Sequence, residues 1–416
     1  MEPNLMRALD FWVGVPLTFL ITILLRIKRF VHSSAARPGP PHNILFIQLA
    51  EMGAIVLAYP ALRKARELFP DANLYFLCFE QIRASVEVLE IIPPENIITI
   101  DARSPVSLAR DTLSFAGRAR RRSIDTVINL EAFVRYSSIV SWLTGAKRRV
   151  GFHRFNQEGL YAGNLLTHHV LYNPHIHTAH AFLDLVHALD SPPVQIPRVK
   201  RPRTTDCLEV PQVRADANIA AEIWRKLAGL APSIGPDRKL VVVNPNASDR
   251  FPMRRLPLAS FVEITRQLLN DPDVFILITG AASERPDARP ICEAVGSPRV
   301  LDLTGGTTLP ELLQLFNLAH VLVTNDSGPA HLAALTKIHM IVFFGPETPD
   351  RYRPLARNLD VVHTGLTCSP CIGPHNQRLS PCNDNVCLKS VNVHDVVALV
   401  RLRLEAARLA SDSASA

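Results

Sequence analysis

The chain contains 416 residues, of which 47% are hydrophobic and 20% are charged, so it can form the cores of two ordinary domains. High apolar content without a short repeat excludes collagen, a coiled coil and wholesale disorder. The 45 Lys and Arg residues exceed the 38 Asp and Glu residues by a formal charge of +7, and only 6% of residues are aromatic. This modest excess suits an anionic substrate or an anionic membrane surface, and no nucleic-acid partner is expected.

The amino-terminal segment is apolar. Residues 11–25 carry no charge, and Arg26, Lys28 and Arg29 follow at once. As a helix this run is about 22 Å long, and flanking turns with snorkelling basic side chains can extend it toward the roughly 30 Å of a hydrocarbon core. We therefore predict a membrane anchor over residues 1–36, with the rest of the chain on the cytoplasmic side of the inner membrane. A cleaved signal peptide and a buried core helix are the alternatives, and the run either spans the bilayer or lies in its interface.

From residue 43 onward, short apolar runs alternate with segments of helical spacing, which predicts parallel sheets covered by helices. The expected strands are 44–49, 74–79, 97–100, 126–130, 240–244, 274–279, 300–303, 321–324 and 338–344. A proline-rich connection at 191–236, with a helix over 215–230, separates a domain at 42–190 from one at 237–400, and 401–416 forms a tail. Two such modules are expected to face each other across a cleft.

The segment 320–335 has the features of an anion site. A strand is expected to end at Asp326, Ser327 is a natural helix N-cap, and Pro329 suits the first turn. Gly328 allows a ligand to approach the backbone, and His331 offers a further donor. Such a helix start favours a diphosphate. The alternative is a plain strand–turn–helix corner in which the serine only caps and the histidine only packs.

Residues 323–333, followed by Phe-Phe-Gly-Pro at 343–346, resemble the signature of glycosyltransferase family 9, the heptosyltransferases of lipopolysaccharide core assembly. Segments 44–62, 148–152, 244–248 and 254–257 resemble further family segments in the same order, so the resemblance covers about residues 43–400. It implies a GT-B fold, in which two Rossmann-like doubly wound α/β domains face a cleft and the carboxyl-terminal domain binds the donor. It also implies inverting, metal-independent transfer of a sugar, here heptose, from a nucleotide-diphospho-sugar to a lipid-linked or lipopolysaccharide-type glycan acceptor.

The resemblance also assigns donor residues, namely Ala247, Ser248, Glu284, Asp326, Ser327, Gly328 and His331. Arg254 stands where the family usually has a lysine, and either cation can neutralise charge on the departing diphosphate. Arg250 and Arg255 are rivals for this role. Glu284 matches a carboxylate near the ribose hydroxyls, or else marks a solvated helix end. For Asp326 we expect a sugar hydroxyl or a backbone N–H as partner, because a carboxylate repels phosphate.

The acceptor loop departs from the family pattern. Inverting transfer needs a base, and the family usually has an aspartate directly after the loop glycine, where this chain has Ala54. Glu51, in a loop with Met52 and Gly53, is the proposed substitute base. Alternatively, Glu51 only binds acceptor or caps the helix. A further alternative, motivated by Ala54, is a catalytically inactive sugar-nucleotide-binding or scaffold protein.

Four of the seven cysteines crowd into residues 368–387, which favours a reducing compartment over a disulfide-stapled secreted protein. The spacing of Cys368, Cys371, Cys382 and Cys387 suits a structural zinc site, with free thiols and disulfides as alternatives. Bound zinc would favour a third interpretation, a zinc-dependent interaction module fused to a Rossmann pair. The family resemblance requires no metal or cofactor for catalysis.

Overall fold

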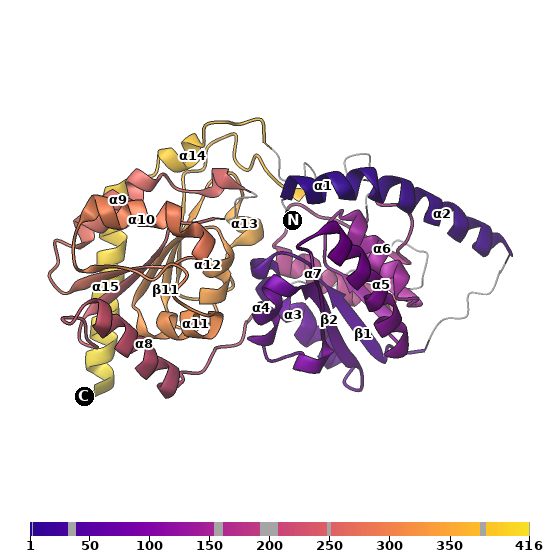
Figure 1. Cartoon of the computed structure of the whole chain (residues 1–416), viewed down its shortest axis with the longest axis horizontal. Helices are drawn as coiled ribbons and strands as arrows, with labels where there is room; N and C mark the ends of the chain where they lie inside the picture. The colour runs from indigo at the N-terminus through magenta and orange to yellow at the C-terminus, as the bar shows by residue number, and fades with distance from the viewer. Residues whose placement is uncertain are drawn as a thin grey trace. The chain divides into compact units, whose positions relative to one another are not determined.

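The structure is a computed structural model, and it describes residues 1, 3–31, 39–153, 161–191, 207–247, 251–374 and 380–415. The chain divides into two compact units, Met1–Leu208 and Glu209–Ala416. Each unit contains one parallel sheet with helices packed around it (Figure 1). The predicted class, two doubly wound α/β units, is therefore confirmed.

The first sheet has the strand order β3-β2-β1-β4-β5-β6, and every neighbouring pair is parallel. Its strands are β1 Asn43–Ile47, β2 Asn73–Phe79, β3 Ile97–Ile100, β4 Thr126–Asn129, β5 Arg148–His153 and β6 His168–Leu171. The helices of this unit that follow β1 are α3 Met52–Leu68, α4 Arg83–Glu87, α5 Pro105–Arg121, α6 Arg135–Leu143 and α7 Thr178–His187. The central strands are buried on both faces, which is why they show as continuous apolar runs.

Two further helices, α1 Pro3–Trp12 and α2 Gly14–Val31, precede this sheet and pack against α6. Among the described residues, Asn4–Ile27 is the one helical segment long and apolar enough to cross a membrane, with a mean hydropathy of 2.0. Only 22% of its most apolar window is buried. The segment is thus packed along one side, which is not the fully buried core helix considered above.

The second sheet has the order β12-β11-β10-β7-β8-β9 and is also parallel throughout. Its strands are β7 Lys239–Asn244, β8 Val274–Ile278, β9 Val300–Asp302, β10 Val321–Asn325, β11 His339–Phe344 and β12 Leu359–His363. The helices are α8 Ala217–Leu230, α9 Leu258–Leu268, α10 Arg285–Val295, α11 Leu309–Leu318, α12 Gly328–Ala333, α13 Pro349–Tyr352, α14 Val386–Lys389 and α15 Val393–Ser415. Helix α8, which we expected inside the connection, packs against α11 and belongs to this unit.

In both sheets the order in which strands are added changes side at one place, the topological switch point. The chain lays down the first three strands of each sheet outward on one side, then returns to add the fourth next to the first, so β1 lies beside β4 and β7 beside β10. Connections leave these paired strands toward opposite sides, which opens a crevice at their carboxyl ends where ligands of such sheets bind. The loops after β1, β4, β7 and β10 are therefore the places to search for a site.

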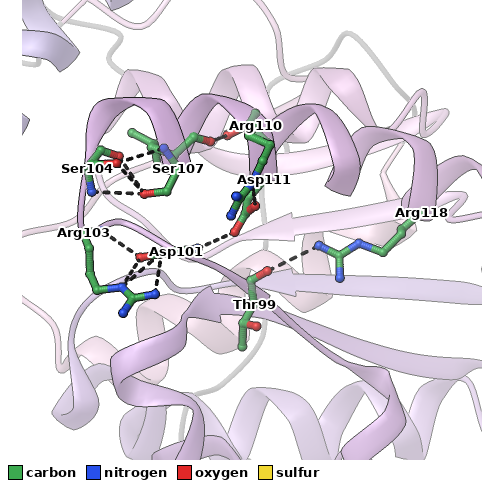
Figure 2. A network of polar contacts seen from close by, with 10 residues as sticks. Thr99, Asp101, Arg103, Ser104, Ser107, Arg110, Asp111 and Arg118 are labelled. Atoms are coloured by element: carbon green, nitrogen blue, oxygen red, sulfur yellow. Dashed lines mark hydrogen bonds and ion pairs between the residues drawn. The ribbon is translucent and has the colours of Figure 1, made fainter.

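A polar network fixes the carboxyl end of β3 to the start of α5 (Figure 2). Asp101 accepts hydrogen bonds from Nε of Arg103 at 3.0 Å and from its Nη2 at 2.9 Å, and the backbone N–H of Asp101 donates to Asp111 at 3.0 Å. These bonds from Arg103 hold the pKa of Asp101 below its usual range. Ser104 and Ser107 form a reciprocal cap at the helix start. These bonds hold the loop after β3 against the first turns of α5.

Candidate active site

In the second unit, Asn325 joins the loop after β7 to the end of β10. Its side-chain Oδ1 accepts a hydrogen bond from the backbone N–H of Leu256 at 2.9 Å, and its Nδ2 donates to the carbonyl of Pro245 at 2.7 Å. The side chain is fully buried, so both bonds are shielded from water. The two segments that carry the predicted donor residues are thereby held together at the switch point of the sheet.

Arg254 and Asp326 form an ion pair at this point. Nη2 of Arg254 lies 2.5 Å from Oδ2 of Asp326, and the two side chains are 15% and 2% exposed. The guanidinium also lies 5.8 Å from the ring centroid of Phe251. The structure therefore gives Asp326 a cationic partner, Arg254, that the sequence analysis did not name. The family resemblance placed both residues in the donor site, but the sequence analysis did not pair them.

Asn246, in the loop directly after β7, has a buried side chain with unmet hydrogen-bonding capacity. The residue is 2% exposed, and among the described residues neither its Oδ1 nor its Nδ2 has a hydrogen-bond partner. Gly280, after β8, approaches so closely that an added Cβ would lie 2.6 Å from this Nδ2. A buried amide without partners costs about 1–3 kcal/mol, so such a group is typical of a site that a ligand completes. We did not single out Asn246 from the sequence.

The predicted donor residues that follow Asp326 lie at the start of α12, directly after β10. Ser327 occupies the N-cap position of α12, yet its hydroxyl makes no capping bond and instead lies 3.5 Å from the hydroxyl of Thr324. Ser327 is therefore the N-cap residue that the sequence predicts, although its hydroxyl does not bond to the first turn of the helix. Gly328 is the first residue of this six-residue helix, and His331 on it is buried.

Two expectations for the neighbouring loops are refined by the structure. Oε2 of Glu284 accepts a hydrogen bond from the backbone N–H of Ala281 at 2.7 Å, so this carboxylate caps the turn after β8. Arg255 donates from Nε and Nη2 to the carbonyl of Ala247 at 3.0 and 2.6 Å, so it fixes this loop and stays a rival to Arg254 for the diphosphate. Ser248 and Arg250 lie outside the described residues.

In the first unit, Glu51 follows β1 as the N-cap residue of α3, with no capping bond from its side chain. The helix begins at Met52, so Met52 and Gly53 belong to its first turn and not to a longer loop. Glu131, just after β4, is a second carboxylate at this switch point, and its Oε1 accepts from the backbone N–H of Leu49 at 2.7 Å. Its position directly after a predicted strand was the available signal, and we overlooked it.

The cysteine cluster does not form a recognisable metal centre. Within the described parts of the chain, no group of three or more His, Cys, Asp or Glu side chains could hold a metal ion. Cys368 and Cys382 are exposed, whereas Cys387 is buried and burial raises the pKa of its thiol. The zinc alternative therefore has no support in these residues.

The comparison with protein families decides the affiliation. The family model described as glycosyltransferase family 9 (heptosyltransferase) matches residues 112–379, well over half of the chain. The chain belongs to glycosyltransferase family 9. A lipooligosaccharide heptosyltransferase 2 of Campylobacter jejuni is 26% identical over 167 residues, which cover 38% of this chain and 49% of that protein. The chain thus spans about half the length of the curated relatives that it matches in this way.

Solved structures agree with the GT-B architecture of this family 9 chain. E. coli ADP-heptose lipopolysaccharide heptosyltransferase II is similar with a TM-score of 0.69 at 17% identity, over 88% of this chain and 99% of that one. An E. coli heptosyltransferase with ADP has a TM-score of 0.57 at 16% identity, over 87% and 99%. At these identities the likeness establishes the fold alone.

Proposed function

We propose that this chain is an inverting, metal-independent glycosyltransferase. It moves a heptose from a nucleotide-diphospho-sugar to a lipid-linked or lipopolysaccharide-type glycan acceptor, at the cytoplasmic face of the inner membrane. Membership of family 9 supports the reaction class, and the names of the relatives support the sugar. The apolar helical segment 4–27 supports the membrane location.

The donor is assigned to the second unit. The observation that carries this assignment is the buried, unpartnered amide of Asn246 in the loop that Asn325 joins to the Arg254–Asp326 pair. Arg254 supplies positive charge toward the diphosphate, and Asp326 fixes the orientation of the guanidinium. The amide of Asn246 can donate and accept, as a sugar or ribose hydroxyl requires. Because a structural neighbour contains ADP, an ADP-linked heptose is the first donor to test.

The proposed transfer forms one bond and breaks one bond at the anomeric carbon, and no metal ion takes part. The acceptor hydroxyl oxygen forms a bond to the anomeric carbon on the face opposite the diphosphate. The bond from that carbon to the diphosphate oxygen breaks, and its electron pair leaves with the nucleotide, where Arg254 neutralises the charge. Glu51 takes the hydroxyl proton as general base. Glu131 positions the loop that precedes Glu51 through its bond to Leu49.

The test is a donor screen on the purified full chain. ADP- and GDP-heptose, UDP- and GDP-hexoses and dTDP-sugars are titrated calorimetrically, and release of nucleoside diphosphate is followed with membrane extract as acceptor. We expect one donor to bind and turn over, Asn246→Ala to weaken that binding, and Glu51→Gln to bind normally without turnover. Glu95→Gln, an exposed carboxylate in the same unit, is the matched control and should keep full activity.

Other outcomes separate the alternatives. Donor binding without turnover in the unmodified chain would overturn the catalytic assignment and favour the inactive sugar-nucleotide-binding protein suggested by Ala54. Turnover that survives in Glu51→Gln would reject Glu51 as the base while keeping the reaction class. No binding to any donor would reject the donor site.

A further inference from the structure

The amino-terminal helices are attached to the first unit by a buried ion pair. Oδ2 of Asp10 lies 3.0 Å from Nη1 of Arg135 on α6, and Oδ1 of Asp10 accepts the backbone N–H of Tyr136 at 2.9 Å. The side chain of Arg135 is only 3% exposed. Asp10 is therefore the counter-charge of a buried arginine in the folded unit, and the end of α1 is an integral part of that unit.

The contact continues along α2 through small and polar residues. An added Cβ at Gly14 would lie 3.0 Å from Cβ of Arg135, so the helix approaches α6 closely here. One turn later Thr18 is fully buried, and after another turn the hydroxyl of Thr22 accepts the backbone N–H of Asn164 at 2.8 Å. Ile21 packs in the same cluster as Ile139 and Leu165. One stripe of α2, repeating every three to four residues, is thus used for docking. Figure 1 shows α1 and α2 following one another along the first unit, next to α6.

Large apolar side chains are exposed on the other side of these helices. Trp12, the last residue of α1, is 74% exposed. From Phe11 onward, the other large exposed apolar side chains of these helices and the turn between them are Phe11, Val13, Leu17, Phe19, Leu20, Ile23, Leu24 and Ile27. Contiguous apolar surface of this kind is rare on a protein surrounded by water and marks a binding face. We call these nine residues the apolar face.

We propose that the apolar face lies in the interface of an anionic lipid bilayer, with α1 and α2 parallel to the membrane plane and not crossing it. A helix that is docked along its length onto a folded unit cannot cross the hydrocarbon core unless the unit enters it too. Crossing would also separate Asp10 from Arg135 and leave both charges without partners.

Charge and composition favour a bilayer over another protein surface. Arg26 is exposed next to the apolar face, and the sequence continues with Lys28 and Arg29, which complement anionic headgroups. No charged residue occurs between residues 11 and 25, and tryptophan, here the most exposed member of the apolar face, is enriched at membrane–water interfaces. This combination is typical of in-plane membrane helices.

The arrangement also bears on the acceptor, a step that rests on the proposed function. Met6 on α1 packs against the core cluster that contains Leu49, two residues before Glu51, and Asp10 contacts the first turn of α6 just beyond Glu131. Helix α1 therefore lies at the edge of the first sheet that carries the candidate acceptor residues. A lipid-linked acceptor held in the bilayer can then reach Glu51 without leaving the membrane.

Vesicle sedimentation tests the membrane face without any donor or acceptor. The full chain is mixed with vesicles of phosphatidylethanolamine and phosphatidylglycerol (3:1) or of phosphatidylcholine alone. We expect sedimentation with the anionic vesicles and at least a tenfold weaker partition for the triple variant Phe19→Glu, Leu20→Glu, Leu24→Glu. The control Val106→Glu with Leu113→Glu changes exposed apolar residues on α5 and should bind like the unmodified chain. Circular dichroism should show equal helix content in all three proteins.

Orientation is tested by an amino-terminal epitope tag in sealed inverted membrane vesicles, whose outer surface is the cytoplasmic one. Added protease should remove the tag without detergent, since an in-plane helix leaves it on the same side as the folded units. A protected tag would establish a spanning helix and overturn the proposal. So would a chain that ignores vesicles but forms dimers, seen by sedimentation velocity, that the triple variant abolishes. Because neither assay needs turnover, a failure here leaves the proposed transferase reaction to be judged separately.

Discussion

The buried pair between Arg254 and Asp326 allows a quantitative test of the donor site. In Asp326→Asn the guanidinium loses its counter-charge in a position where only 15% of its surface is exposed. Breaking a buried pair by changing one partner costs about 3–5 kcal/mol. The amide oxygen that replaces the carboxylate can still accept one hydrogen bond, so we expect the lower end, about 3 kcal/mol. For a unit of this size that corresponds to a fall in Tm of roughly 6–12 °C.

The assay is urea unfolding of the full chain, with Arg254→Met, Asp326→Asn and the double variant compared in a cycle. Each single variant should be destabilised, because each leaves one group of the pair without its partner. The double variant should be less destabilised than the sum of the two, since it removes both charges together. Arg289→Met is the control, because the pair of Arg289 with Glu293 is exposed and worth only about 0.3–0.5 kcal/mol.

Two results would refute this reasoning. If Asp326→Asn cost no more than Arg289→Met, the pair would not be shielded from water as the structure has it. If the two single effects simply added, the side chains would not interact. A coupled pair that contributes to donor binding should also respond to ligand: the bound donor should raise the Tm of the unmodified chain and have much less effect on Arg254→Met.

Three further predictions concern the remaining features. In Gly280→Ala the new methyl group would lie 2.6 Å from Nδ2 of Asn246, so we expect a loss of about 1–3 kcal/mol in urea unfolding and weaker donor binding by calorimetry; an unchanged donor affinity would argue against Asn246 as a ligand residue. The hydrogen bonds from Arg403, and then from His339, hold the pKa of Asp360 below its usual value, so this carboxylate stabilises the fold above about pH 3.9 and the contribution is lost as the pH falls through the folded pKa. Arg403→Met should accordingly lower stability at pH 6 and flatten the acid limb of a stability–pH curve, whereas a parallel downward shift at all pH values would contradict the linkage. Burial raises the pKa of Cys78 to about 12, so peptide mass spectrometry after iodoacetamide treatment at pH 8 should find Cys78 unmodified and the exposed Cys207, Cys368 and Cys382 modified, and equal rates would contradict its burial.

The sheets could be predicted where burial is complete on both faces. Central strands such as β1, β2 and β10 consist of apolar runs, and their predicted limits lie within two residues of the observed ones. Strands β6 and β12 were missed because their His-His-Val-Leu and Leu-Asp-Val-Val-His sequences mix polar with apolar residues, whereas the other two edge strands, β3 and β9, were predicted. Strand β5 was missed because its two arginines interrupt the apolar pattern.

The site could be predicted where its residues are consecutive. The residue types from Asp326 to His331 are typical of a turn followed by a helix start, and in the structure this segment lies at the switch point of the second sheet. The ion pair with Arg254 and the bond from Leu49 to Glu131 join residues that are distant in the chain, so local spacing holds no information about them. The unmet hydrogen bonds of Asn246 are a property of its surroundings alone. Candidate site residues within one turn can thus be predicted from the sequence, whereas contacts between two loops cannot.

For the amino-terminal helices, composition does not predict the contacts with the first unit. Residues 4–27 are long enough and apolar enough to span a bilayer. Gly14, Thr18 and Thr22 are small enough to look compatible with a spanning helix, yet here they form the stripe that meets the first unit. The informative residue is Asp10, because a carboxylate at the start of an apolar helix must find a partner before it can be buried. Its partner Arg135 is 125 residues away in the chain. A charged residue beside an apolar run can therefore indicate a contact with a distant part of the fold, and not only the end of a membrane span.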